Sequence, residues 1–265
     1  MNGLPFDKLR ANVYQQNIIG VKMTFYRVVI LIVMLSITGF SDENVIDMNA
    51  KIQECKNEKN GKSCYDAGQY FSKNQEENSS NQTLYYYGQG CKYNYQESCV
   101  EEVDYAIQKH FFLKRFTRKI VSVGDLYFQQ NEYKKAFEYY NIAAQYNDSE
   151  AFYKKSLTSI KSDSNISNAE KYYFQYIRSV ISNIDFYSEH KILIRLRKTG
   201  TIELKFVLLQ DGSIAELMIT KPSQDDDLNK YVYISIQKLP KFYPIPFEFQ
   251  KDKIIIVAPI VLRLS

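Results

Sequence analysis

Residues 200–223 read GTIELKFVLLQDGSIAELMITKPS, and this stretch decides the fold of the C-terminal part of the chain. Apolar residues occupy every second position from Ile202 to Leu208, so the pattern predicts a β-strand with one buried face. An Asp-Gly pair follows at 211–212, where glycine supplies the positive φ that a hairpin turn requires. The run Ile214–Thr220 is then expected to return as a second strand.

Helices are expected on either side of this hairpin. Upstream, SNAE at 167–170 reads as a capping box, and apolar residues then recur at helical spacing from Phe174 to Ile184. Downstream, a second helical stripe runs from Leu228 to Leu239. The stretch KLPKFYPIPFEF at 238–249 cannot continue that helix, because its prolines lack backbone donors and fix φ. Residues 254–264, IIIVAPIVLRL, predict the last strand.

The proline-rich connector has two interpretations. The last strand must lie beside the first, so a stiff segment can carry the chain back with little conformational entropy to lose. Phe242 and Tyr243 would then cover the end of the core. In the alternative interpretation, these two rings form a face that grips a partner.

From about residue 42 to 163 the pattern becomes helical and repetitive. The stretch 64–91, CYDAGQYFSKNQEENSSNQTLYYYGQGC, pairs small residues with aromatic ones, and VGDLYFQQNEYKKAFEYYNIAAQYND at 123–148 repeats the design. Small residues let two helices approach closely, and helix pairs that cannot bury their faces alone stack into a solenoid. The polar stretch KSDSNISNAEK at 161–171 breaks the pattern. We therefore predict domains at 42–163 and 166–265.

Residues 1–41 are expected to lie outside the fold. An apolar run from Val28 to about Phe40 follows Arg27, and small residues fit a cleavage position after Ser41, as in a secretory signal peptide. The run is shorter than the roughly 20 residues that span a bilayer, yet an uncleaved membrane anchor stays open. Met23 is expected to be the true start.

If the protein is exported, its four cysteines are expected to be oxidised. Cys55, Cys64, Cys91 and Cys99 form an even set, which in an exported protein argues for disulfides. Metal binding is the alternative, but the chain has no CxxC motif and two histidines. We expect no metal and no cofactor.

The net charge and the absence of catalytic motifs argue against a nucleic-acid-binding protein and against an enzyme. The net charge of +4 is mild and scattered, so no nucleic-acid partner is expected. The apolar content of 45% is that of a globular protein. The chain has no S-x-x-K paired with K-T-G, no G-x-S-x-G, no H-E-x-x-H and no phosphate loop, so we do not expect an enzyme.

The unit C…A-G-x-Y-F…Y-Y-x-G-x-G-C resembles the SEL-like repeats of exported, cysteine-rich bacterial proteins, a variant of the tetratricopeptide repeat. This resemblance implies the disulfides Cys55–Cys64 and Cys91–Cys99. Some members of that group are linked to β-lactam binding or hydrolysis, which stays open as an alternative function.

Residues of about 170–264 resemble the TonB C-terminal domain family, which shares its shape with the end domain of TolA. The resemblance rests on FYSEHKI…GTIELKFVLLQDGSI, on ITKPSQDDDLNKYVYISIQK and on FYPIPFEF…IIIVAPIVLRL. It implies a three-stranded antiparallel sheet with two helices, and hence a mainly α chain with an α+β C-terminal domain.

The same resemblance implies that the final strand, Ile254 to Leu264, is an edge that accepts an extended peptide by β-augmentation. Pro259 would limit uncontrolled pairing of this edge. The side chains expected to frame the partner strand are Ile254, Ile256, Ala258 and Ile260.

Together these features predict an exported adaptor, a repeat scaffold joined to a TonB-like domain, in the periplasm of a Gram-negative bacterium. Its partner would be an envelope or outer-membrane protein, and a homodimer through the edge strand is a further possibility. Membrane contact would come only through an uncleaved N-terminal segment. The main alternative is an inner-membrane-anchored TonB-type energy transducer for outer-membrane transport, facing the periplasm.

Overall fold

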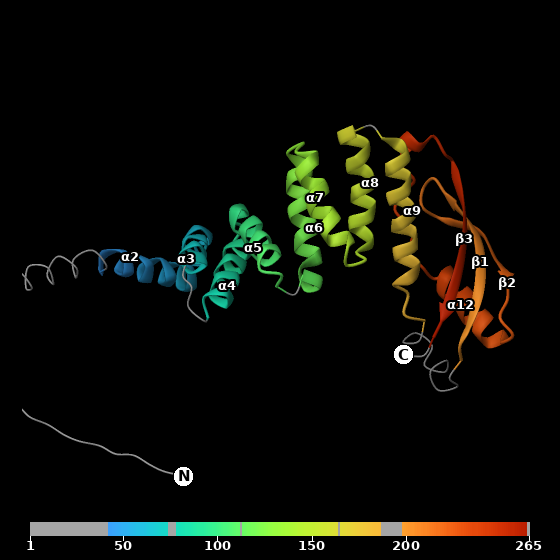
Figure 1. The fold of residues 1–265 in the computed structure, drawn as a ribbon, viewed down its shortest axis with the longest axis horizontal. Coiled ribbons are helices and arrows are strands. Elements are labelled where there is room, and N and C mark those ends of the chain that lie inside the picture. Colours follow the sequence, from blue (N-terminus) through green and yellow to red (C-terminus); the bar gives the residue numbers. More distant parts are fainter. Residues whose placement is uncertain (1–41, 74–77, 112, 164, 187–197, 264–265) are drawn as a thin grey trace, which may run out of the picture. The chain divides into compact units, whose positions relative to one another are not determined.

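The computed structural model of the 265-residue chain describes residues 42–73, 78–111, 113–163, 165–186 and 198–263 (Figure 1). The predicted signal segment, its cleavage position and Met23 lie outside the described residues. Contacts divide the chain into two compact units, with the division between Tyr93 and Asn94.

The first unit is helical. It contains α2 (Asp42–Gln53), a π-helical turn η1 (Glu54–Glu58), α3 (Gly61–Lys73) and α4 (Ser79–Lys92). Cys55 of η1 is bonded to Cys64 of α3, so a disulfide fixes the start of the α3–α4 pair. Phe71 and Tyr86 stack with their ring centroids 5.3 Å apart between these two helices.

The second unit begins with further helices. They are α5 (Gln96–Gln108), α6 (Leu113–Gln129), α7 (Tyr133–Ala144), α8 (Ser149–Asp163) and α9 (Ile166–Ser182). The predicted domain boundary at 163–166 falls between α8 and α9, which pack on each other (Figure 1). Asn165 caps α9 by accepting a hydrogen bond from the backbone N–H of Asn168, 3.0 Å away. The predicted cap at Ser167 is therefore wrong by two residues.

Small residues allow the close helix packing that the sequence pattern indicated. A Cβ at Gly68 of α3 would lie 2.4 Å from the ring of Tyr87 in α4, closer than real contacts come. In the second unit, a Cβ at Gly124 of α6 would lie 2.5 Å from the ring of Tyr140 in α7. In both helix pairs, a tyrosine ring of one helix thus packs directly against the glycine backbone of the other.

The sheet has three antiparallel strands in the order β2-β1-β3. Its elements are β1 (Gly200–Leu209), β2 (Ile214–Lys221), α12 (Asp226–Gln237), a 3-10 turn η2 (Phe247–Phe249) and β3 (Lys253–Leu262). The fold class predicted from the sequence is confirmed: a helical region is followed by a three-stranded antiparallel sheet.

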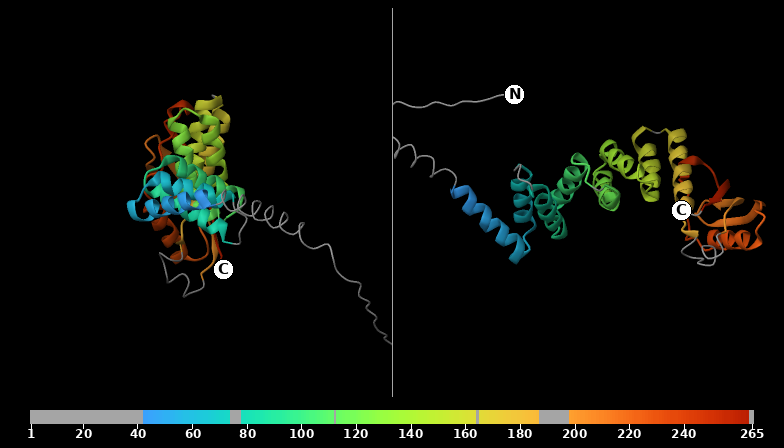
Figure 2. Two further views of the ribbon diagram at one scale, coloured as in Figure 1. Left: turned by 90° about the vertical axis from the view of Figure 1, so that its left-hand side faces the viewer. Right: turned by 60° about the horizontal axis from the view of Figure 1, so that its bottom comes forward.

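The core of this sheet is built mainly from the strands β1 and β3, the helices α12 and α9, and the proline-rich connector. Ile202, Leu204, Phe206 and Leu208 of β1 are fully buried, as their alternation predicted. Three apolar residues of α12 join them, and α12 and the sheet form two layers in the right-hand view of Figure 2. The strand β3, the helix α9 and the proline-rich connector supply most of the remaining buried residues of the cluster.

The β1–β2 turn is anchored on that connector. Gly212 has a φ of +81°, so the predicted positive φ is confirmed. Its carbonyl accepts a hydrogen bond from the N–H of Phe242, and the N–H of Ile245 donates to the carbonyl of Gln210, both at 2.9 Å. The hairpin tip therefore holds the chain as it crosses toward β3.

Candidate peptide-binding edge

The strand β3 lies at one edge of the sheet. It pairs with β1 in continuous antiparallel register, from Leu209↔Lys253 to Gly200↔Leu262. No described strand pairs with its other side. That side therefore presents an unpaired row of backbone groups, which is the feature that strand addition needs.

Side chains of β3 alternate between the core and solvent. Ile254, Ile256, Ala258 and Ile260, which the sequence assigned to framing a partner strand, are each no more than 9% exposed and lie on the core side. Their role toward a partner stays a prediction. The intervening side chains of Ile255, Val257 and Val261 are 57, 56 and 51% exposed.

Pro259 reveals which backbone groups of β3 face outward. Antiparallel neighbours alternate between pairs that exchange both hydrogen bonds and pairs that exchange none. Pro259 is paired with Glu203 and has no N–H, so theirs is a pair without exchange. The backbone groups of Pro259 point to the free edge, and by alternation so do those of Ile255, Val257 and Val261.

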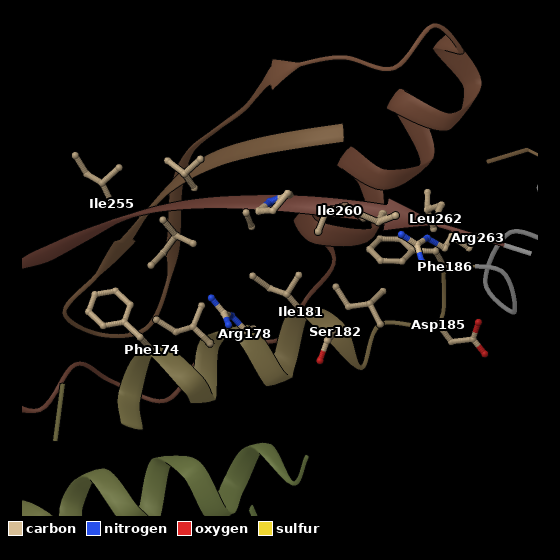
Figure 3. A pocket seen from close by; sticks show the side chains of 17 residues that line it. Phe174, Arg178, Ile181, Ser182, Asp185, Phe186, Ile255, Ile260, Leu262 and Arg263 are labelled. Atoms are coloured by element: carbon tan, nitrogen blue, oxygen red, sulfur yellow. The ribbon is translucent and has the colours of Figure 1, made fainter. Parts of the chain in front are cut away.

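A groove of about 880 Å³ opens beside this edge. One wall is β3 from Ile255 to Leu262 with the following Arg263, and the other is the face of α9 that carries Phe174, Arg178 and Ile181 (Figure 3). Phe174 lies near the Ile255 end of β3 in that view, and Ile181 lies nearer Ile260. The groove therefore runs along β3 with α9 alongside.

The helix α9 is held in place by the connector. The N–H of Tyr243 donates to the hydroxyl of Tyr176 at 2.7 Å, and the hydroxyl of Tyr173 donates to the carbonyl of Tyr243 at 2.8 Å. The ring of Tyr243 also stacks on Tyr153 of α8 at 4.4 Å between centroids. Burial raises the pKa of Tyr176 to about 12, so its hydroxyl is neutral at physiological pH.

The rings of Phe242 and Tyr243 both make contacts within the protein. Phe242 is 3% exposed and stacks on Phe206 of β1 with ring centroids 6.1 Å apart. Tyr243 keeps 41% of its surface exposed. Phe242 belongs to the buried core, as the first interpretation of the connector expected, while Tyr243 packs against the core residue Tyr176. A grip on a partner by these rings stays a prediction.

The cysteines are oxidised. Cys55 and Cys64 form the disulfide that the repeat resemblance implied. Cys91 and Cys99 are disulfide-bonded too, and no described cysteine is free. Within the described ranges, no three His, Cys, Asp or Glu side chains come together as a metal site.

Residues 191–264 match the family model of the Gram-negative bacterial TonB protein C-terminal. The match contains the sheet, α12 and the free edge of β3, and it supports a TonB-type envelope protein. Domains of this kind interact with envelope or outer-membrane proteins, and the family is not one of enzymes. The helix α9 precedes the match.

The other comparisons add nothing to this assignment. No curated protein and no solved structure matches the chain. The helical region agrees with a repeat architecture, while its assignment to SEL-like repeats stays a prediction. The TonB match and the disulfides favour an envelope or periplasmic location. Among the described helices, none is long and apolar enough to cross a bilayer.

Sequence reasoning missed the second wall of the groove. It identified the apolar side of α9 but not Arg178, because a lone arginine on a helix usually indicates a solvated face. The available signal was spacing: residues 174, 178 and 181 recur at intervals of four and three, which places them on one side of a helix.

Proposed function

We propose that this protein is an exported adaptor whose TonB-like domain binds an extended segment of an envelope protein as a fourth strand on β3. One observation carries the proposal: a groove runs along the free edge of β3, and no described strand covers that edge. The helical region would serve as a scaffold that positions this domain.

Backbone and side chains of β3 both suit strand addition. Ile255, Val257 and Val261 each offer an N–H and a carbonyl to an incoming strand, about 4.8 Å away. Their exposed apolar side chains also offer cross-strand partners, each contributing about 0.2–1 kcal/mol. The missing donor at Pro259 leaves one gap in the row, so a bound strand would be held on both sides of that gap.

The decisive test compares two substitutions at Val257. Val257→Pro removes one outward N–H without touching a bond to β1, because Val257 and Lys205 form a pair without exchange. Val257→Thr changes the same side chain but keeps the N–H. Purified chains would be used to capture partners from an envelope fraction, and each captured segment would be tested as a peptide by deuterium exchange.

The expected result is protection of residues 253–262 by the peptide, retained with Val257→Thr and weakened at least tenfold with Val257→Pro. Equal binding by both variants, or a peptide that protects only residues 42–163, would move the function to the helical scaffold. Sedimentation of the chain alone would show whether a second copy occupies the same edge.

The energy-transducer alternative has one observation in its favour: the same sequence contains an apolar run at 28–40 and a TonB-type match at 191–264. It requires that this run stay in the inner membrane. Sequencing the N-terminus of the protein from fractionated cells separates the two, because an adaptor released by cleavage would begin near residue 42. The β-lactam alternative predicts turnover of nitrocefin by the purified protein.

A further inference from the structure

The wall opposite β3 comes from a helix that the TonB family model does not include. The match begins at residue 191, whereas α9 ends at Ser182. The helix nevertheless belongs to the core of the sheet, where Ile177 and Ile181 are 2 and 7% exposed. A strand that pairs with β3 would therefore contact side chains that lie outside the matched segment.

Arg178 places a positive charge on this wall of the groove. Two lysines of the same unit are paired: Lys154 with Asp125 at 2.6 Å, and Lys251 with Glu170 at 2.8 Å. Arg178 is exposed and forms no ion pair with any described residue.

The other described residues that line the groove do not neutralise the charge of Arg178. Among the 17 described residues that line the groove, Asp185 is the acidic one, and it is engaged in an interaction of its own. Arg263 adds a second positive charge at the far end (Figure 3). The described lining of the groove therefore carries net positive charge.

Resting on the proposed strand addition, we infer that Arg178 selects a partner segment with a carboxylate side chain at the middle of the groove. A guanidinium binds a carboxylate through two parallel hydrogen bonds, which gives geometry as well as attraction. The apolar walls reduce the screening of that pair relative to open solvent. The partner's acid would supply a counter-charge that the described lining does not give to Arg178.

Spacing extends the inference to the flanking residues of the partner. One helical turn advances about 5.4 Å, and two strand residues advance about 6.7 Å. Side chains two positions before and two after the carboxylate would therefore lie against Phe174 and Ile181, both apolar. The expected partner motif is apolar-x-acidic-x-apolar, where x faces away from α9.

The test is a selection from a displayed library of random 12-residue peptides, using the full chain as bait. Three baits are compared: the natural chain, Arg178→Glu, and Arg118→Glu. Arg118 is an exposed arginine of α6 outside the groove, so its reversal is a matched control for charge. Selected peptides are then assayed for affinity and for protection of residues 253–262.

Peptides selected on the natural chain should carry the motif, and replacing their acid by its amide should weaken binding about tenfold. Arg178→Glu should reverse the preference toward a basic residue, while Arg118→Glu should leave it unchanged. Peptides that protect β3 without an acidic preference, or that ignore Arg178→Glu, would overturn this inference and leave strand addition standing. A selection without β3-protecting peptides would overturn both.

Discussion

Replacing Gly212 by alanine should destabilise the sheet domain more than any other single change in its hairpin turn. At this position φ is +81°, a conformation that side chains other than hydrogen rarely adopt. A Cβ built there would lie 1.9 Å from the carbonyl oxygen of Phe242. That oxygen is backbone, so the connector itself would have to move to relieve the contact.

The expected cost follows from these two contacts. The positive φ costs an alanine about 1–2 kcal/mol relative to glycine. Moving the connector weakens the bonds from Phe242 to Gly212 and from Ile245 to Gln210, each contributing about 1 kcal/mol. We therefore expect Gly212→Ala to lower the free energy of unfolding of this domain by about 3 kcal/mol.

Amide hydrogen exchange of β1 is the suitable assay, because it reports the sheet domain separately from the helical region. Gln210→Ala serves as the control, since this exposed side chain of the same turn should change stability by less than about 0.5 kcal/mol. If the two variants exchanged equally fast, the docking of the hairpin on the connector would not stabilise the domain, and the reasoning would be refuted.

Further changes test the helical packing and the tyrosine contacts. Because burial raises the pKa of Tyr176 from 10.0 to about 12, its stabilising contribution is complete below pH 10 and is lost as pH rises through 12. Urea unfolding at pH 9 to 12 should show a smaller loss for Tyr176→Phe than for the natural chain, and equal slopes would contradict this. Replacing Cys55 and Cys64 by alanine should cost about 2–3 kcal/mol, and reductant should then shift the melting of the first unit less than it does in the natural chain. Gly124→Val should cost about 1–3 kcal/mol by overpacking against Tyr140, and an unchanged melting temperature would argue against that contact.

Local sequence pattern was sufficient for the strands and the turn. The alternation from Ile202 to Leu208 and the glycine at 212 are decided within a few residues, and the structure agrees with both. The start of α9 was predicted two residues too late, because Asn165 and Ser167 are both residue types that favour the N-cap. The structure uses Asn165, whose side chain reaches the N–H of Asn168.

Two other features depend on contacts that no local pattern contains. The strand β3 reads IIIVAPIVL, with apolar residues on both faces, so the sequence cannot show which set is buried. The structure buries the set that begins at Ile254. Likewise, the stacking of Tyr153 on Tyr243 joins residues 90 positions apart, and only the folded chain shows that α9 forms one wall of the groove.

The double packing of α9, against α8 on one side and the sheet on the other, has a mechanical consequence. A pull on a strand bound to β3 would load the ladder to β1 in shear, so that many hydrogen bonds resist together. The load would also pass through the tyrosine contacts of the connector into α9 and on to α8. Tension on the partner would therefore be transmitted to α8 and α9 through side-chain packing. These two helices would hold the sheet domain in place under load.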